Sequence, residues 1–576
     1  MKKLMLGNEA VARGAYEAGV RVVSSYPGTP STEITENMAK YEGPHVEWAP
    51  NEKVALEVSC GASFGGGRAM SCMKHVGLNV AADPLFTVSY TGVNAGLVVV
   101  VADDPGMHSS QNEQDSRFYA RSAHIPMLEP ADSQEAKDFA RRAFALSEEY
   151  DTPILLRMCT RISHARSMVE QGEVEQVALK PFQKDPMKYV MMPGMARARH
   201  LVVEARMEKM AQNAASLGFN RVEMGDSKIG IVTDGTAYQY VKEAMPEASV
   251  LKLGMVYPIA MDQVKEFAQK VEKLYVVEEL EPFIEDQLRA AGISVSGGKD
   301  LFGRQGELTA AKIAEKLAGR KMDAAPAAEL PQRPPVLCPG CPHRATFYVL
   351  NKLKLTVTGD IGCYTLGAMA PLSAVDACVC MGASIGMAHG MEKAGGEAVS
   401  EHTVAVIGDS TFIHSGITGL IDIVYNKGNA TVLILDNSTT GMTGHQPNPA
   451  TGKTIRLEDT YQVDLKALCQ AVGVQHVREV DPFNMKELEQ ALREETARKA
   501  PSVIICRRPC VLLSKQQTHS LRVNNDACRN CRACMKIGCP AIEKRDKGVW
   551  INPALCNSCG LCVQMCAFNA IEKAGE

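Results

Sequence analysis

The hydrophobic residues of this chain fall in short runs, separated by longer stretches in which apolar residues recur with helical spacing. Seven runs are rich in Val, Ile and Leu and lack a polar face; they span residues 97–102, 154–158, 229–233, 273–277, 403–407, 431–435 and 502–506. Such continuous runs are typical of strands that are covered on both faces. Because they alternate with amphipathic stretches, we expect βα units and parallel sheets in both halves of the chain.

Two stretches break this alternation. Residues 322–335 are rich in Ala and Pro and have no hydrophobic period, which predicts a linker between the two halves. Residues 180–225 are rich in Met and charged residues and predict a long helix that joins two N-terminal domains. At ~150 residues per domain, the 576 residues suggest about four domains. We expect them at residues 1–185, 226–321, 330–515 and 519–576.

The composition excludes several classes of protein. Apolar residues make up 45% and charged residues 22%, as in ordinary globular proteins. The net charge of −4 is spread along the chain, so no basic block indicates nucleic acid or an anionic membrane. The N-terminal residues lack a signal-peptide pattern, and the most apolar segment is shorter than the ~20 residues that span a bilayer. We expect a cytoplasmic protein without nucleic-acid or membrane partners.

The 19 cysteines are unevenly distributed, and without a secretory signal we interpret most motifs among them as metal ligands rather than disulfides. Eight lie in the last fifty residues, in the runs Cys528-x2-Cys531-x2-Cys534-x4-Cys539-Pro540 and Cys556-x2-Cys559-x2-Cys562-x3-Cys566. Short x2 loops let successive thiolates converge on one cubane, and the fourth cysteine of each run ligates the other cluster. We therefore expect two 4Fe–4S clusters, one on Cys528, Cys531, Cys534 and Cys566 and one on Cys556, Cys559, Cys562 and Cys539.

This spacing resembles that of bacterial two-cluster ferredoxins over about fifty residues. Two features depart from the pattern: four residues rather than three precede Cys539, and Ala567 replaces the usual proline. The alternative is a pair of structural zinc sites with four cysteines each, but the paired quartets and the Cys539-Pro540 dipeptide favour iron. Six other cysteines are expected to be small core residues: Cys60, Cys72, Cys159, Cys378, Cys380 and Cys469.

Polar residues follow two of the predicted strands in the second half. Gly408-Asp409-Ser410 comes after the run at 403–407, and Asp436-Asn437-Ser438-Thr439-Thr440-Gly441 comes after the run at 431–435. The carboxyl ends of neighbouring parallel strands meet at one edge of a sheet, which places Asp409 and Asn437 side by side. Together with the Thr439 carbonyl they offer the oxygen ligands of a hard cation and leave room for a diphosphate. The alternative is a simple turn and a loop cap.

The 28-residue offset between Asp409 and Asn437 favours the cation site. It resembles the signature of thiamine diphosphate enzymes, Gly-Asp-Gly followed by asparagine at a similar distance. The resemblance implies Mg²⁺ on Asp409, Asn437 and Thr439, and a diphosphate held by the residues Gly408, Asp409, Ser410, Asn437, Thr439 and Gly441. Ser410 replaces the usual third glycine, which adds a hydroxyl near the phosphates and removes no metal ligand.

A thiamine enzyme also needs a carboxylate at N1′ of the aminopyrimidine, carried by a separate domain. Glu52 follows a short predicted strand and opens an amphipathic helix, the setting in which thiamine domains carry this glutamate. The alternative is that Glu52 only stabilises the helix dipole, a contribution of about 0.3–1 kcal/mol.

Upstream, residues 25–32 read Ser-Tyr-Pro-Gly-Thr-Pro-Ser-Thr and resemble the Tyr-Pro-x-Thr-Pro-Ser loop of 2-oxoacid:ferredoxin oxidoreductases. In that family the loop threonine contacts the substrate carboxylate, which implies this role for Thr29. The alternative is a proline-rich turn that ends in a Ser/Thr helix cap. Residues 62–69, Lys74 and His75 are expected to help line the cofactor cleft.

Four more cysteines lie in short motifs of the second half. Cys338-Pro339-Gly340-Cys341 follows the linker directly, and Gly-Cys and Pro-Cys pairs come later in the chain. In 2-oxoacid:ferredoxin oxidoreductases such positions hold a cluster close to thiamine, which implies a third 4Fe–4S cluster on Cys338, Cys341, Cys363 and Cys510. Cys506 competes for the fourth position but lies inside a strand pattern. The alternatives are a redox-active Cys-x-x-Cys pair or a motif without a cluster.

The order of these features resembles the alpha subunit of the indolepyruvate:ferredoxin oxidoreductase family, most specifically in residues 337–344 and 408–416. The resemblance implies a multidomain α/β fold. Its parts would be a thiamine domain on the pyrimidine side (1–185), a transketolase C-terminal-like domain (226–321), a thiamine domain on the diphosphate side (330–515) and an α+β two-cluster ferredoxin domain (519–576). It also implies oxidative decarboxylation of indolepyruvate with coenzyme A to indoleacetyl-CoA, CO₂ and reduced ferredoxin. The partners would be a smaller catalytic beta subunit and external ferredoxin, in a hetero-oligomer.

Three other functions are weighed against this one. A related oxidoreductase could act on other aryl or aliphatic 2-oxoacids, because the substrate pocket is not readable from the sequence. A non-oxidative thiamine decarboxylase or ligase would have no use for eight ferredoxin cysteines. A non-catalytic electron-transfer subunit would leave Glu52, Asp409 and Asn437 without a role.

Overall fold

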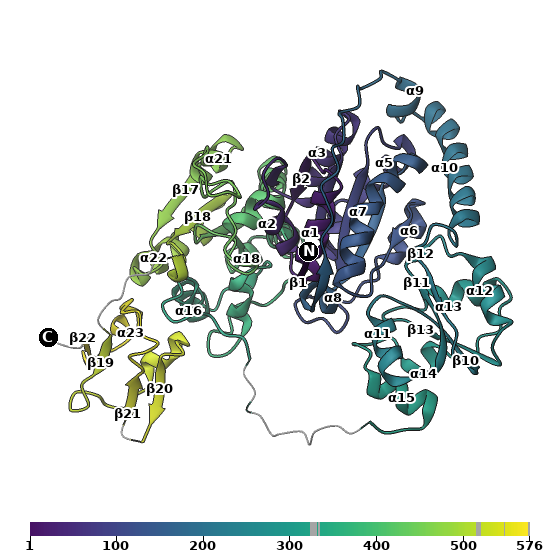
Figure 1. Cartoon of the computed structure of the whole chain (residues 1–576). Coiled ribbons are helices and arrows are strands. Elements are labelled where there is room, and N and C mark those ends of the chain that lie inside the picture. Colours follow the sequence, from purple (N-terminus) through teal and green to yellow (C-terminus); the bar gives the residue numbers. More distant parts are fainter. Residues whose placement is uncertain (323–330, 332–333, 514–519, 547, 574–576) are drawn as a thin grey trace. The chain divides into compact units, whose positions relative to one another are not determined.

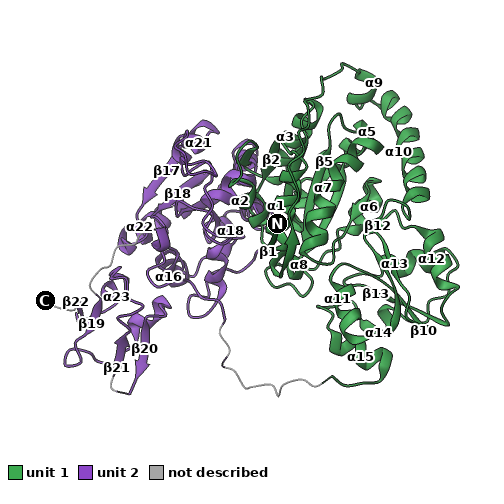
Figure 2. Ribbon diagram, in the orientation of Figure 1, with its two compact units in different colours: residues 1–328 green, residues 329–576 purple. Residues whose placement is uncertain are grey.

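The computed structural model describes residues 1–322, 331, 334–513, 520–546 and 548–573. Most of the predicted linker at 322–335, and the predicted domain boundary between residues 515 and 519, therefore lie outside the described residues. The chain divides into two compact units, residues 1–328 and residues 329–576 (Figure 2). Among the described residues, no helix combines the length and the apolar character needed to cross a bilayer.

The first unit is built on a seven-stranded sheet in the order β12-β6-β7-β5-β4-β2-β3, in which only β12 runs antiparallel to its neighbour (Figure 1). Every residue of β4, β5 and β7 is buried, which explains why most of β5 and of β7 is apolar without a polar face. The strands are β2 (Val22–Ser25), β3 (His45–Trp48), β4 (Ala69–Lys74), β5 (Leu97–Asp103), β6 (Met127–Leu128), β7 (Ile154–Cys159) and β12 (Met255–Tyr257).

Helices cover this sheet, and an antiparallel pair of strands, β1 (Lys2–Leu6) and β8 (Arg166–Glu170), lies beside it. The long helix predicted within residues 180–225 is confirmed as α10. The helices are α1 (Gly7–Glu17), α2 (Thr32–Met38), α3 (Glu52–Phe64), α4 (His75–Val80), α5 (Ala82–Thr91), α6 (Arg117–Ala123), α7 (Ser133–Tyr150), α8 (Thr160–His164), α9 (Pro186–Tyr189) and α10 (Pro193–Asn213).

A second, four-stranded sheet completes the first unit, in the order β13-β10-β11-β9 with only β9 antiparallel. Its strands are β9 (Arg221–Glu223), β10 (Asp226–Asp234), β11 (Ala248–Leu253) and β13 (Lys273–Val277). Its helices are α11 (Gly235–Ala244), α12 (Met261–Ala268), α13 (Phe283–Ala290), α14 (Lys299–Phe302) and α15 (Ala310–Ala318).

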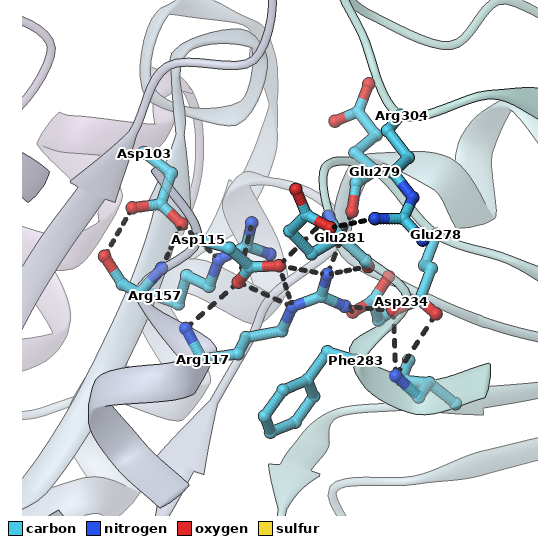
Figure 3. A network of polar contacts seen from close by, with 12 residues as sticks. Asp103, Asp115, Arg117, Arg157, Asp234, Glu278, Glu279, Glu281, Phe283 and Arg304 are labelled. Carbon is cyan, nitrogen blue, oxygen red and sulfur yellow. Dashed lines mark hydrogen bonds and ion pairs between the residues drawn. The ribbon is translucent and has the colours of Figure 1, made fainter. Parts of the chain in front are cut away.

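Buried ion pairs join the two sheets of this unit (Figure 3). The fully buried guanidinium of Arg117 contacts Asp234 at 2.9 Å and Glu278 at 2.6 Å, at the carboxyl ends of β10 and β13. Asp115 holds the same guanidinium at 2.6 Å. Removing one partner of such a cluster would leave buried charge uncompensated, so the network fixes how the two sheets pack. No sequence motif predicted it.

The second unit contains a five-stranded parallel sheet in the order β14-β15-β16-β18-β17. Its strands are β14 (Thr356–Thr358), β15 (Thr403–Gly408), β16 (Thr431–Asp436), β17 (His476–Val480) and β18 (Ser502–Arg507). Its helices are α16 (His343–Leu353), α17 (Ala383–Gly395), α18 (Glu397–Ser400), α19 (Asp409–Thr411), α20 (Ile417–Tyr425), α21 (Leu465–Ala471) and α22 (Met485–Thr496), with shorter turns η1 (Cys363–Ala368), η2 (Phe412–Gly416) and η3 (Val511–Leu513). All seven strands predicted from apolar runs are therefore confirmed.

The C-terminal part of this unit is small and mixed. It has two antiparallel pairs, β19 (Leu521–Val523) with β22 (Ile571–Lys573) and β20 (Ile542–Arg545) with β21 (Gly548–Ile551), plus η4 (Ala533–Ile537) and α23 (Leu561–Gln564). Its buried apolar residues Leu521, Ile537 and Ile571 belong to the same core cluster as Leu433 and Ile504 of the parallel sheet. The predicted multidomain α/β fold with an α+β C-terminal part is confirmed.

Candidate active site and cysteine clusters

Asp409 lies at the carboxyl end of β15, as the first residue of α19. Since Gly408 pairs with Leu435 of β16, the loop after β16 leaves the sheet at the same edge. Asp409, Asn437 and Thr439 are all buried at this edge. The structure therefore places the three predicted oxygen donors at one edge of the sheet, and their role as cation ligands stays a prediction.

The electrostatic setting of Asp409 suits a bound cation. Burial, and to a lesser degree the charge of Asp436, raises the pKa of Asp409 to about 7. Within the described residues no ion pair neutralises this carboxylate, and its side-chain partner Asn448 donates only a long hydrogen bond of 3.4 Å. A hard divalent ion would supply the missing positive charge to these oxygen ligands. The residues present thus fit Mg²⁺ and a diphosphate.

Asn448 was not singled out by the sequence, because it belongs to no recognisable motif. Its amide contacts both Asp409 and the hydroxyl of Thr440, the latter also at 3.4 Å. Thr440 in turn donates to the hydroxyl of Ser410 at 3.1 Å. Asn448 therefore ties the Gly-Asp-Ser turn to the loop that follows β16.

Backbone contacts relate the four cysteines outside the ferredoxin-like runs to one another and to the loop after β16. Cys341 N donates to Cys338 O at 3.1 Å, and Cys510 N donates to Asn437 O at 2.9 Å. Burial first, and then the charges of Cys338 and Cys363, raise the pKa of the Cys341 thiol to about 12. Burial, and then the charges of Cys510 and Cys338, raise the pKa of Cys363. Burial, and to a lesser degree the charge of Cys338, raises the pKa of Cys510. The competing Cys506 lies inside β18 and is buried there.

This quartet adjoins the diphosphate loop. A methyl group built on Gly441 would lie 3.4 Å from Cys363 Sγ and 3.6 Å from Asn437 Nδ2, so the thiol and the amide both lie close to this glycine. Cys510 Sγ lies 3.8 Å from Nε2 of His445, a residue of the same loop that the sequence did not indicate. Four thiols suit a 4Fe–4S cluster, and one placed here would sit beside the diphosphate site.

Neighbouring cysteines are found in both C-terminal sets that the spacing predicted, and their assignment as cluster ligands stays a prediction. One small cavity is lined by Cys528, Cys531, Cys534 and Cys566. The charges that act most strongly on the buried thiol of Cys562 are those of Cys559, Cys556 and Cys539, in that order. Both donor sets therefore have the composition of a cubane site.

Two cysteines were wrongly predicted to be core residues. Cys378 and Cys380 are exposed, because they lie in the irregular segment between β14 and α17 rather than on a buried face. Cys60, Cys72, Cys159 and Cys469 are buried, as expected.

In the first unit, Glu52 is the first residue of α3 and is buried. The preceding Asn51 caps the helix, since its side chain accepts a hydrogen bond from Val54 N at 2.9 Å. The N-terminus of α3 is therefore capped by Asn51 and does not need Glu52 for this. Helix α4 packs directly on this carboxylate: a methyl group built on Gly77 would lie 2.5 Å from Glu52 Oε1.

This close approach makes Gly77→Ala a sharp probe of the Glu52 position. The added methyl would push the carboxylate aside, and we expect turnover to fall by up to about 10²-fold, since a displacement near 1 Å costs that much in a positioned group. Steady-state kinetics and circular dichroism provide the check. Gly61→Ala on α3 is the matched control, because its methyl would meet no atom within 4 Å. Equal activity in both variants would contradict a catalytic role for the Glu52 position.

The loop of residues 25–32 connects β2 to α2 and leaves Thr29 half-buried. Pro30 O accepts a hydrogen bond from Asn8 Nδ2 at 2.7 Å, and Gly28 lies against the side chain of Lys74. Ser31 precedes α2, but its hydroxyl donates to Gly28 O at 2.8 Å and does not cap the helix. The loop is therefore held in a defined shape that presents Thr29 near the end of β4.

His75 opens α4 and is buried. Burial lowers its pKa, so the ring is neutral near pH 7. Among the described residues, neither ring nitrogen has a hydrogen-bond partner. A buried imidazole with free nitrogens in the segment that packs on Glu52 suits contact with a bound molecule.

Four protein-family models match parts of this chain. The model "Pyruvate flavodoxin/ferredoxin oxidoreductase, thiamine diP-bdg" matches residues 13–224, and "Thiamine pyrophosphate enzyme, C-terminal TPP binding domain" matches residues 360–506. "Indolepyruvate oxidoreductase domain" matches residues 221–332, and "4Fe-4S binding domain" matches residues 549–572. The last match favours iron over the zinc alternative.

The matched families define a thiamine diphosphate-dependent oxidoreductase that carries iron–sulfur clusters. Three relatives named "Indolepyruvate oxidoreductase subunit IorA" match the entire chain: those of Pyrococcus abyssi (41% identical, 97% of its length), Archaeoglobus fulgidus (39%, 98%) and Methanothermobacter thermautotrophicus (40%, 98%). The chain belongs to the family of indolepyruvate oxidoreductase subunits IorA.

Proposed function

We propose that this chain is the thiamine-binding subunit of an enzyme that converts indolepyruvate and coenzyme A to indoleacetyl-CoA, CO₂ and reduced ferredoxin. The observation that carries the proposal is that Cys363 Sγ and Asn437 Nδ2 both lie close to Gly441, which supports a cluster ligand next to the proposed diphosphate loop. The names of the relatives support indolepyruvate as the substrate. The second candidate is the same reaction on other aryl or aliphatic 2-oxoacids.

In this proposal each group of residues has its own role. Asp409, Asn437 and the Thr439 carbonyl hold Mg²⁺, and through it the diphosphate. Glu52 accepts a hydrogen bond from N1′ of the aminopyrimidine, and Thr29 donates to the substrate carboxylate. Thiamine diphosphate, when bound, supplies a C2 carbanion for attack on the keto carbon and an electron sink as CO₂ leaves.

Three cysteine quartets are proposed to hold 4Fe–4S clusters, which serve as one-electron carriers. They are the Cys338 quartet (Cys338, Cys341, Cys363, Cys510), the Cys528 quartet (Cys528, Cys531, Cys534, Cys566) and the Cys539 quartet (Cys556, Cys559, Cys562, Cys539). The Cys338 quartet lies beside the diphosphate loop and receives electrons first. A smaller beta subunit completes the catalytic complex, and the assembly works in the cytoplasm, where thiols stay reduced.

The test is ferredoxin reduction by the purified two-subunit complex, assayed across a panel of 2-oxoacids with coenzyme A. We expect indolepyruvate to give the highest kcat/KM. Preference for an aliphatic 2-oxoacid would establish the second candidate, and thiamine-dependent CO₂ release without ferredoxin reduction would refute both.

Cys338→Ser tests the first quartet in the complete enzyme. We expect loss of about four irons per chain, one cubane's worth, together with loss of substrate-driven bleaching. Iron analysis and EPR on anaerobic protein provide the measurement. Cys380→Ser is the control, because Cys380 is exposed and lies outside the three quartets. Unchanged iron content in Cys338→Ser would leave the enzyme with two clusters.

The Cys528 quartet is the proposed exit for electrons. Cys531 is exposed there, and the exposed Arg529 and Arg532 line the same cavity, which suits an acidic ferredoxin. Reversing both charges to Glu should raise the KM for ferredoxin at least about tenfold, with a weaker salt dependence, and leave cluster reduction by substrate unchanged. Arg545→Glu, on β20, is the control. An equal rise in KM for the control would place the docking surface elsewhere.

A further inference from the structure

Arg344 is a buried cation that joins two of the cysteine quartets. It is the second residue of α16, directly after the Cys-Pro-Gly-Cys segment, and only 2% of it is exposed. Its Nε donates to Cys338 O at 2.8 Å. Its Nη1 donates to Gly538 O and, at 3.4 Å, to Ile537 O, in the residues that lead into Cys539. One side chain thus links the Cys338 quartet to a ligand of the Cys539 quartet.

Among the described residues, Arg344 forms no ion pair with Asp or Glu, and its Nη2 is buried without a hydrogen-bond partner. Its hydrogen-bond partners are backbone carbonyls beside the cluster cysteines, those of Cys338, Ile537 and Gly538. A buried cation is costly unless it is paired, so cluster thiolates and sulfides are the natural counter-charge.

A second contact joins the Cys-Pro-Gly-Cys loop to the second ferredoxin-type run, which supplies the other three ligands of the Cys539 set. Asn557, next to Cys556, donates through Nδ2 to Pro339 O at 3.1 Å. A methyl group built on Gly340 would lie 3.3 Å from the Asn557 amide. The Cys-Pro-Gly-Cys loop is therefore packed against the second ferredoxin-type run, with Arg344 at the junction.

We propose that Arg344 sets the reduction potential of the cluster on Cys556, Cys559, Cys562 and Cys539, and so directs electrons from the Cys338 quartet into it. The inference rests on the proposed function. In the step concerned, one electron leaves the Cys338 cluster, which is oxidised, and enters the Cys539 cluster, which is reduced; no bond or proton changes. A guanidinium keeps its charge, and in a buried site that charge stabilises the more negative, reduced cluster.

The experiment is a redox titration followed by EPR, performed on the complete two-subunit enzyme. Arg344→Gln should shift the one-electron distribution about tenfold away from the Cys539 cluster, which corresponds to a potential ~59 mV lower. Arg344→Lys keeps the charge without the fork of hydrogen bonds and should restore most of the shift. Arg545→Gln removes an exposed charge from the same domain and should leave the potential unchanged.

Wild-type enzyme separates the two hypotheses. If wild-type enzyme lacks iron at the Cys338 quartet, the part of the proposed function that assigns a third cluster is wrong. If it holds all three clusters and Arg344→Gln leaves the potential of the Cys539 cluster unchanged, the Arg344 inference is wrong. A lowered potential in Arg344→Lys equal to that in Arg344→Gln would also overturn it, because only packing would then matter. Should Arg344→Gln fail to hold iron, wild-type enzyme labelled with ¹⁵N-arginine decides. Hyperfine coupling between a guanidinium nitrogen and the reduced cluster supports the inference, and its absence overturns it.

Discussion

Asp409→Ala is expected to abolish retention of both Mg²⁺ and thiamine diphosphate, and turnover with them. The diphosphate would be held largely through the cation, and Asp409 is the carboxylate in its ligand set. Its burial beside Asp436, without a neutralising ion pair in the described residues, is what a bound cation would relieve. Thiamine and magnesium analysis after gel filtration provides the measurement.

The cysteine quartets should survive this substitution, so iron content serves as an internal reference. Asp459→Ala is the matched control, because Asp459 is almost fully exposed and pairs only with Lys453. We expect that variant to keep cofactor and activity. Normal thiamine content in Asp409→Ala would remove the cation site from this edge of the sheet.

Glu52→Gln is expected to retain the cofactor and lose about 10²- to 10⁴-fold in turnover, the range for removal of a positioned acid–base group. The amide keeps the shape of the side chain but cannot promote the imino tautomer of the aminopyrimidine. Exchange of the C2 proton in deuterium oxide measures this step directly. Glu57→Gln on the same helix is the control, since Glu57 is exposed and pairs with Lys53. Exchange at the wild-type rate in Glu52→Gln would reassign the residue to a structural role.

Much of the candidate site was readable from the chain because its residues are set by local structure. Asp409 and the loop from Asn437 follow adjacent parallel strands, and parallel strands bring such turns to one edge wherever they pair. The ferredoxin-type quartets follow from x2 loops, whose geometry depends little on the rest of the fold. The exposed Cys378 and Cys380 show the limit, because an apolar residue type in an irregular segment carries no information about burial.

The residues that the sequence missed act across long separations. Gly77 matters because α4 approaches Glu52 from 25 positions away in the chain, and no local pattern encodes that contact. Arg344 reaches Gly538, 194 positions later, and Arg117 reaches Glu278, 161 positions later. Each of these contacts forms only when two segments that are distant in the sequence pack together.

By itself, the sequence predicted the strands, the division into α/β parts and the family, and these are confirmed. It also predicted the cation and cluster ligands, which stay predictions. Periodicity and ligand spacing are local properties, so they can be interpreted without knowledge of distant contacts. Only the tertiary structure decided which charges are buried, that Cys363 and Asn437 share Gly441 as a neighbour, and that Arg344 lies between two quartets. These features depend on how helices and loops pack, because desolvation and charge pairing are set by the surrounding atoms and not by the order of residues.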